Sequence, residues 1–205
     1  VREQLWETLK TIIENHARGT SFNIRLDSDG LLSHGPQLTW MDAVVDGQPI
    51  TPRAEKAVEV QALWYNALKT VELLASRFKE RGEAENYLQM AEKAKKSFIE
   101  KFWSPEQNCL FDVIGEYEKD GSLRPNQIIS VALDFTILDK TKSEKIVDTM
   151  HRELLTPYGL RTLARNDPKY IGVYAGDRRS RDKAYHNGTV WPWLFGPFTT
   201  AFLKT

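Results

Sequence analysis

The stretch from Gln37 to Leu68, QLTWMDAVVDGQPITPRAEKAVEVQALWYNAL, begins as a polar loop and ends in a long apolar segment. Apolar residues recur at helical spacing through its second half and beyond, which predicts one helix over residues 54–80. The loop carries Trp40 and Asp42, and the first turns of the helix carry Glu59. The pattern therefore predicts that a loop and the helix after it present aromatic and acidic side chains together.

The same helical spacing recurs along the rest of the chain. It predicts further helices over residues 1–17, 84–103, 126–138, 142–155 and 189–203. Gly82 is expected to end the helix over 54–80, so that this helix and the next form an antiparallel hairpin. With long polar loops between its helices, the chain is predicted to be all-α, an array of helical hairpins whose loops gather around a cleft.

Strand-like pieces are expected only as small β-hairpins in the loops. One such piece alternates apolar residues before Asp-Ser-Asp-Gly at 27–30, and others lie within residues 108–123. The tetrapeptide suggests a calcium loop, but Leu31 stands at the fifth position and no bidentate glutamate follows at the right distance, so no metal site is predicted. Residues 156–188 form a long loop, and loops of that length are usually functional.

Composition bounds the class of protein. The chain has 205 residues, of which 41% are hydrophobic and 27% charged, with no compositional break, so a single domain over residues 1–205 is expected. Lys+Arg and Asp+Glu both total 28, and this zero net charge argues against a nucleic-acid or anionic-membrane partner. The N-terminus has the pattern of an amphipathic helix and not of a signal peptide. A lone Cys109 excludes an intrachain disulfide, and a cytoplasmic location is predicted.

Tryptophan is the unusual signal. Four of the six tryptophans lie between residues 40 and 64 or at residues 191–193, beside carboxylates. Indole faces suit flat, partly apolar ligands such as sugar rings, although core packing is the alternative explanation for any single tryptophan.

Asp42 is the first candidate for chemistry. A carboxyl group held near an apolar face such as Trp40 loses solvation and keeps its proton, which a general acid requires. The alternative is a turn or cap aspartate. Glu59 is expected to point toward Trp64 or Asn66 if its helix lines a cavity, and the alternative is a carboxylate favoured by the helix dipole.

Two further segments carry polar groups just before predicted helices. Asn126 and Gln127 follow a proline, where asparagine caps a helix but where amides also suit sugar hydroxyls. Residues 172–178 include Tyr174, and His186 and Asn187 lie just outside the start of the last helix. The chain lacks HExxH and CxxC patterns, so no metal ligand set is predicted, and it also lacks GxSxG and P-loop patterns.

Four separated motifs together resemble a known family. QLTWMDAVV, TPR…KAVEVQALWYNAL, LRPNQI and AYHNGTVWPWLFGPF, spread from about residue 30 to the end, resemble the amylo-α-1,6-glucosidase domain of prokaryotic and archaeal glycogen debranching enzymes. The resemblance implies an (α/α)6 barrel, hydrolysis of the α-1,6-linked glucose at a glycogen branch point with inversion, an α-glucan partner, and no cofactor. Asp42 then takes the place of the general acid. The residues expected to bind the sugar are Trp40, Arg53, Glu59, Trp64, Asn66, Asn126, Gln127, Tyr174, His186, Asn187 and Trp191.

The chain departs from this family in two ways. It shows about six helices where the barrel has twelve, so an incomplete portion of the domain is expected. Val190 stands where eukaryotic relatives carry a glutamate, and the resemblance places a candidate base beyond Thr205. Asp177, Asp182 and Glu59 are the alternative bases within the chain. The competing functions are a trehalase-like or glucoamylase-like inverting α-glucosidase and a non-catalytic carbohydrate-binding domain.

Overall fold

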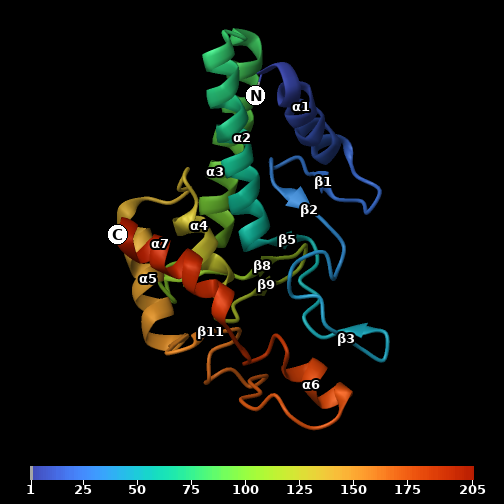
Figure 1. Cartoon of the computed structure of the whole chain (residues 1–205), viewed down its shortest axis with the longest axis vertical. Helices are drawn as coiled ribbons and strands as arrows, with labels where there is room; N and C mark the ends of the chain where they lie inside the picture. Colours follow the sequence, from blue (N-terminus) through green and yellow to red (C-terminus); the bar gives the residue numbers. More distant parts are fainter. Residues whose placement is uncertain (1) are drawn as a thin grey trace.

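A helical hairpin forms the long axis of the molecule. The computed structural model describes residues 2–205. Helix α2 (Val58–Phe78) runs up this axis and α3 (Arg81–Phe102) returns beside it, with α1 (Arg2–Arg18) alongside (Figure 1). The predicted antiparallel hairpin is confirmed.

The turn of the hairpin differs from the prediction in one detail. Helix α2 ends at Phe78, and the next residue, Lys79, takes the left-handed conformation with φ of 65° and donates its backbone N–H to carbonyl groups of the last turn of α2. Gly82, which the sequence suggested as the cap, lies instead in the first turn of α3. The turn is short because a single left-handed residue reverses the chain direction.

The second half of the chain is more broken than its sequence pattern predicted. The residues expected to form one helix over 126–138 form a 3-10 turn, η1 (Pro125–Ile128), and the short α4 (Ile129–Ala132), after which the chain becomes extended at Leu133. The other elements are α5 (Lys140–Glu153), α6 (Arg178–Ala184), η2 (Pro192–Leu194) and α7 (Phe195–Lys204). The predicted last helix therefore begins six residues later than residue 189.

Small antiparallel sheets join the helices, and the predicted all-α class with its (α/α)6 barrel is wrong for this chain. Within the described residues, twelve short strands form five sheets, in the orders β1-β2, β3-β4, β5-β8-β9, β6-β7 and β10-β11-β12. The fold is therefore mixed. The strands are β1 (Arg25–Leu26), β2 (Leu32–Ser33), β3 (Val44–Val45), β4 (Gln48–Pro49), β5 (Lys56–Ala57), β6 (Trp103–Ser104), β7 (Cys109–Leu110), β8 (Val113–Ile114), β9 (Lys119–Asp120), β10 (Leu155–Thr156), β11 (Gly159–Arg161) and β12 (Val190–Trp191).

One hydrophobic core connects the hairpin to the second half of the chain. Phe98 and Phe102 of α3 are fully buried and stack with ring centroids 4.8 Å apart. Buried side chains of α2, α4, α5 and α7 join the same core. No helix among residues 2–205 has both the length and the apolar character that a membrane crossing requires.

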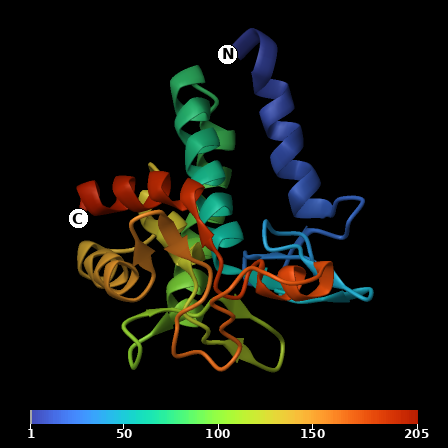
Figure 2. The same ribbon diagram turned by 60° about the horizontal axis from the view of Figure 1, so that its bottom comes forward.

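The loops that carry the candidate site lie together at the lower end of the hairpin. Strand β11 pairs with β12, which fixes residues 159–161 beside the segment before α7. Helix α6 contacts β3, so the loop after Trp40 and the long loop of residues 156–188 meet (Figure 2).

Candidate active site

Trp40 is the centre of an aromatic cluster drawn from two distant segments. Its ring meets the rings of His186, Trp191 and Trp193 edge to face, with centroids 5.1, 5.9 and 5.0 Å apart. The His186 and Trp191 rings stack at 5.8 Å. Edge-to-face contacts fix ring orientation. The structure thus brings together three predicted site residues, Trp40, His186 and Trp191, and adds Trp193.

Gly188 explains how His186 reaches this cluster. Gly188 has φ of 144°, and a Cβ there would lie 2.3 Å from the carbonyl oxygen of Ile171. Its N–H donates to Thr162 Oγ1 at 2.8 Å. Only glycine fits this conformation and this space, so the HNG sequence holds the chain tightly against residue 171 and turns the preceding histidine inward.

Asp42 lies beside His186 at the edge of the cluster. Its carboxylate Oδ1 is 3.8 Å from His186 Nε2, and its side chain is 66% exposed. The expectation that an apolar wall would desolvate this carboxylate is therefore not met, because the loop carries Asp42 past the rim of the aromatic rings and into water.

His186 is buried and uncharged at neutral pH. Only 1% of the residue is exposed, and neither ring nitrogen has a hydrogen-bond partner. Burial, reinforced by the charges of Arg124 and Arg53, outweighs the attraction of Asp42 and lowers the pKa of His186 to about 4. The ring therefore offers Asp42 a neutral neighbour and not a counter-ion.

A buried ionic cluster lies behind Trp40. Arg53 donates to both Glu59 oxygens, at 2.5 and 2.6 Å, and to both Asp112 oxygens, at 2.7 and 3.0 Å. Burial lowers the pKa of Arg53, but the attraction of Asp112 and Glu59 is stronger and raises it, so the guanidinium stays charged. Arg53 holds a left-handed φ of 40°, a strain that these ion pairs compensate. Asp112 was not predicted from the sequence, although a carboxylate inside the apolar run of residues 109–114 is a usable signal.

Arg124 extends the cluster toward the HNG segment. It donates to the backbone carbonyl oxygens of Thr162 and His186, at 3.1 and 2.6 Å, and to Asn187 Oδ1 at 3.0 Å. The Asn187 amide also donates to the Lys183 carbonyl oxygen at 3.1 Å. Asn187, a predicted sugar ligand, thus has both ends of its amide bonded to protein atoms.

The other predicted amides are also bonded internally. Gln127 Oε1 accepts from the Leu110 N–H at 3.0 Å. Asn66 Oδ1 accepts from the Phe135 N–H at 3.1 Å. Asn126 is 1% exposed and accepts from the Trp40 indole N–H at 2.8 Å. Their contribution to sugar binding stays a prediction, and the bonds observed here hold the backbone and Trp40 in place.

Sequence comparison places these residues in a family. All of residues 1–205 match the family described as Amylo-alpha-1,6-glucosidase. The chain belongs to this family. It is also 27% identical over 230 aligned residues to the glycogen debranching enzyme of Saccharomyces cerevisiae strain ATCC 204508 / S288c, covering 90% of this chain. The chain spans 15% of the length of that relative.

Solved structures share the fold at lower identity. A sialidase superposes with a TM-score of 0.74 and 17% identity, over 97% of this chain and 17% of that one. A GH78 family rhamnosidase of Bacillus sp. GL1 superposes with a TM-score of 0.57 and 14% identity, over 73% of this chain and 15% of that one. At these identities the likeness concerns the fold alone.

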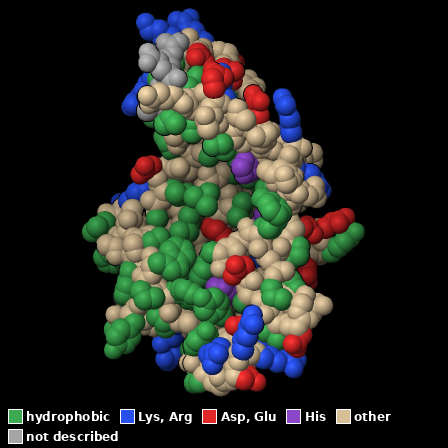
Figure 3. Space-filling model, turned by 45° about the vertical axis from the view of Figure 1, so that its right-hand side comes forward, with side chains coloured by type: hydrophobic (Ala, Val, Ile, Leu, Met, Phe, Trp, Pro, Cys, Tyr) green, Lys and Arg blue, Asp and Glu red, His purple; other side chains and the backbone are tan. Residues whose placement is uncertain are grey.

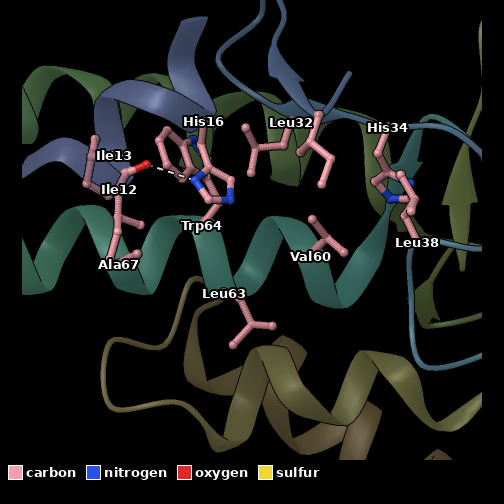
Figure 4. A pocket seen from close by; sticks show the side chains of 11 residues that line it. Ile12, Ile13, His16, Leu32, His34, Leu38, Val60, Leu63, Trp64 and Ala67 are labelled. Carbon is pink, nitrogen blue, oxygen red and sulfur yellow. Dashed lines mark hydrogen bonds between the residues drawn. The ribbon is translucent and has the colours of Figure 1, made fainter. Parts of the chain in front are cut away.

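Trp64 and Tyr174, which were both expected to bind the sugar, lie outside the aromatic cluster. Trp64 is 4% exposed and lines a separate, mostly apolar cavity of about 260 Å³ between α1 and α2, near His16 and His34 (Figure 4). Tyr174 is 47% exposed, with its ring 5.8 Å from that of Tyr185. Tyr185 in turn meets Trp191 at 4.8 Å, so Tyr174 is joined to the cluster only through it.

The carboxylates considered as catalytic bases in this family member each have a protein partner. Asp177 caps α6 by accepting from the Ser180 N–H at 2.8 Å. Asp182 pairs with Arg178 at 3.4 Å, and Glu59 is held by Arg53. Within residues 2–205 no group of three or more His, Cys, Asp or Glu side chains is arranged to hold a metal ion.

Proposed function

We propose that this chain forms the part of a glycoside hydrolase active site that carries the general acid, Asp42. The enzyme would release α-1,6-linked glucose at glycogen branch points by an inverting mechanism. One observation carries the proposal. The Asp42 carboxylate stands at the rim of an aromatic cluster, 3.8 Å from a buried His186 whose ring contacts Trp40 and Trp191. Family membership and the glycogen debranching relative support the substrate class.

The chemistry requires Asp42 to be protonated when the sugar is bound. A general acid donates its proton to the glycosidic oxygen, and water around an exposed carboxylate favours the ionised form. A sugar seated against Trp40 and Trp191 would displace that water. His186 is neutral, so its ring places no positive charge beside the Asp42 carboxylate.

The proposal assigns the acid and not the base. An inverting enzyme needs a second carboxylate about 6.5–9.5 Å from the acid, with a water between them. Glu59 fits this role poorly, because Arg53 occupies both of its oxygens. Asp177 and Asp182 are committed to α6.

The test is Asp42→Asn in the complete protein, with glucose release from a branched limit dextrin as the readout. We expect kcat to fall on the order of 10³-fold while maltooligosaccharide binding changes less than about threefold, since the amide keeps the shape of the side chain but carries no acidic proton. Asp46→Asn, at an exposed carboxylate four residues away that pairs with Arg179, is the matched control and should keep full activity. Undiminished turnover by Asp42→Asn would show that another group is the acid.

A second candidate is a carbohydrate-binding domain without catalysis. It is favoured by the exposure of Asp42 and by the engagement of Glu59 and Asp112 with Arg53. In that case maltooligosaccharide would quench tryptophan fluorescence, and the complete wild-type protein would release no glucose from limit dextrin, trehalose or maltose. Release from trehalose or maltose but not from limit dextrin would instead indicate a different α-glucosidase.

A further inference from the structure

One side-chain hydrogen bond adds to the ring contacts that orient Trp40. Its indole N–H donates to Asn126 Oδ1 at 2.8 Å, while its ring edge or face meets His186, Trp191 and Trp193. Trp40 lies in a loop outside any helix or strand, so regular backbone structure does not hold it. What holds the Asn126 amide therefore helps to set the direction of the indole N–H.

Asp112 decides which way the Asn126 amide points. Asn126 Nδ2 donates to Asp112 Oδ1 at 2.8 Å and also lies 3.6 Å from Met41 Sδ. A carboxylate only accepts hydrogen bonds, and an indole N–H only donates. Only one orientation of the Asn126 amide satisfies both Asp112 and Trp40. If the amide were flipped, its NH2 group would face the indole N–H and its oxygen would face the carboxylate.

Asp112 is itself fixed from several directions. Arg53 Nε and Nη2 donate to its two oxygens at 2.7 and 3.0 Å, and Arg124 Nε lies 3.8 Å from Oδ2. Its backbone N–H donates to the backbone carbonyl oxygen of Asp120 at 2.8 Å, and its own carbonyl oxygen accepts from the Val58 N–H at 3.0 Å. The residue is 3% exposed. Its carboxylate is therefore a rigid acceptor in a charge-compensated setting.

We infer that Asp112 is a positioning residue that orients Trp40 for sugar binding by fixing the Asn126 amide. This inference rests on the proposed function, in which Trp40 forms part of the sugar-binding wall. The relay runs from Arg53 through Asp112 and Asn126 to the indole N–H. Neither Asp112 nor Asn126 needs to touch the sugar for this effect.

Asp112→Asn tests the relay in the complete protein. The new amide has a donor as well as an acceptor, so it no longer imposes one orientation on Asn126, and Trp40 loses its fixed acceptor. We expect maltooligosaccharide affinity to fall about fivefold to tenfold, the scale of one hydrogen bond, with KM raised more than kcat is lowered. Asp120→Asn is the matched control, because the Asp120 carboxylate accepts from the Ser122 N–H at 2.9 Å. The affinity of the Asp120→Asn variant for maltooligosaccharide should stay within about twofold of the wild-type value.

A double-mutant cycle separates positioning from a general structural effect. Trp40→Phe keeps an aromatic ring but has no N–H, so Asp112 has nothing left to orient. We expect Asp112→Asn to cause no further loss of affinity in the Trp40→Phe background. An equal fold-loss in both backgrounds would overturn the inference. If Asp112→Asn does not fold, Asn126→Ser removes the relay while leaving the pair of Arg53 and Asp112 intact. Asn126→Ser is then expected to cause no further loss of affinity in the Trp40→Phe background.

A spectroscopic readout keeps the inference separate from the proposed function. In protein labelled with 5-fluorotryptophan, the Trp40 resonance is the ¹⁹F signal that Trp40→Phe removes. We expect Asp112→Asn and Asn126→Ser to shift or broaden that signal, and Asp120→Asn to leave it in place. An unmoved Trp40 signal in both relay variants would refute the positioning role even if the enzyme is active. A moved signal in a protein that binds no glucan would refute the function and retain the relay.

Discussion

At the scale of single residues, the sequence predicted which side chains lie near the site better than it predicted which groups they bond to. Trp40, Asp42, His186 and Trp191 were expected together, and the structure places them together because their motifs combine ring packing with a tight glycine turn. Arg53 was expected to face the sugar, yet its donors serve Glu59 and Asp112. A guanidinium or an amide fits a sugar hydroxyl, a carboxylate and a backbone group equally well, and the choice depends on long-range contacts that the local sequence does not encode.

The burial of His186 gives a pH-dependent stability. Its pKa is about 4 in the folded chain, against an ordinary value of 6.5. Between these values the unfolded chain binds the proton more readily, so the free energy of unfolding falls as the pH drops through this window and is fully retained above about 6.5. We expect a loss of about 1 to 2 kcal/mol between pH 7 and pH 5, at the lower end if water around Asp42 screens the site.

His186→Phe removes this titration while keeping a buried ring. Thermal unfolding of the complete protein at pH 7 and pH 5 should show a smaller difference for the variant than for the wild type. The carboxylates with lowered pKa values, among them Asp29 and Asp120, do not interfere, because their stabilising effect is lost only near and below their ordinary value of 3.8. An equal pH dependence in wild type and variant would mean that His186 does not titrate in this window.

At the scale of elements, long periodic helices were predicted well and short pieces were not. The predicted helices over 54–80 and 84–103 correspond to α2 and α3, because an apolar stripe repeated over five turns has a strong period. The predicted helix over 126–138 breaks after Ala132, although its residues are apolar enough to continue. Buried helical turns and buried extended segments have the same composition, and over four residues periodicity does not separate them.

Two lysine-to-glycine changes, one at the turn between α2 and α3 and one within α3, should change the free energy of unfolding in opposite directions. Lys79 pays a steric cost at φ of 65°, so we expect Lys79→Gly to raise the free energy of unfolding by about 0.5 kcal/mol. Lys96→Gly, the same change within the exposed part of α3, should lower it by about 1 kcal/mol. Urea unfolding measures both. If Lys79→Gly destabilises as much as Lys96→Gly, the left-handed conformation at residue 79 is not a source of strain.

At the scale of the whole molecule, the fold departs from the all-α expectation because its strands are so short that the sequence indicated only those around residues 27–30 and within 108–123. Each strand has two or three residues, whereas an alternating pattern needs about four to eight to be recognised. The sialidase shares this fold at 17% identity, so the arrangement does not depend on one particular set of side chains. The loops between the helices carry Trp40, Asp42 and His186.

The surface of the molecule combines exposed apolar side chains with zero net charge. Figure 3 shows hydrophobic side chains over much of the lower half of one face, above a group of basic residues at the lower end. On α7, Phe202 and Leu203 are 56% and 79% exposed, although Phe198 of the same helix is buried. With 28 basic and 28 acidic residues, no long-range repulsion keeps such surfaces apart.

We therefore expect the 205-residue chain, produced alone, to self-associate at neutral pH through α7. Its mass in solution, measured by light scattering, should rise with concentration, and Phe202→Ser combined with Leu203→Ser should hold it near that of one chain. Phe22→Ser, at a 71% exposed loop residue far from α7 in sequence, is the control and should leave association unchanged. Because Phe198 and Ala201 supply the buried contacts of α7, the double variant should keep the wild-type helical content by circular dichroism. A wild-type chain that stays monomeric at all concentrations, or equal relief by Phe22→Ser, would show that exposed area on α7 does not drive association.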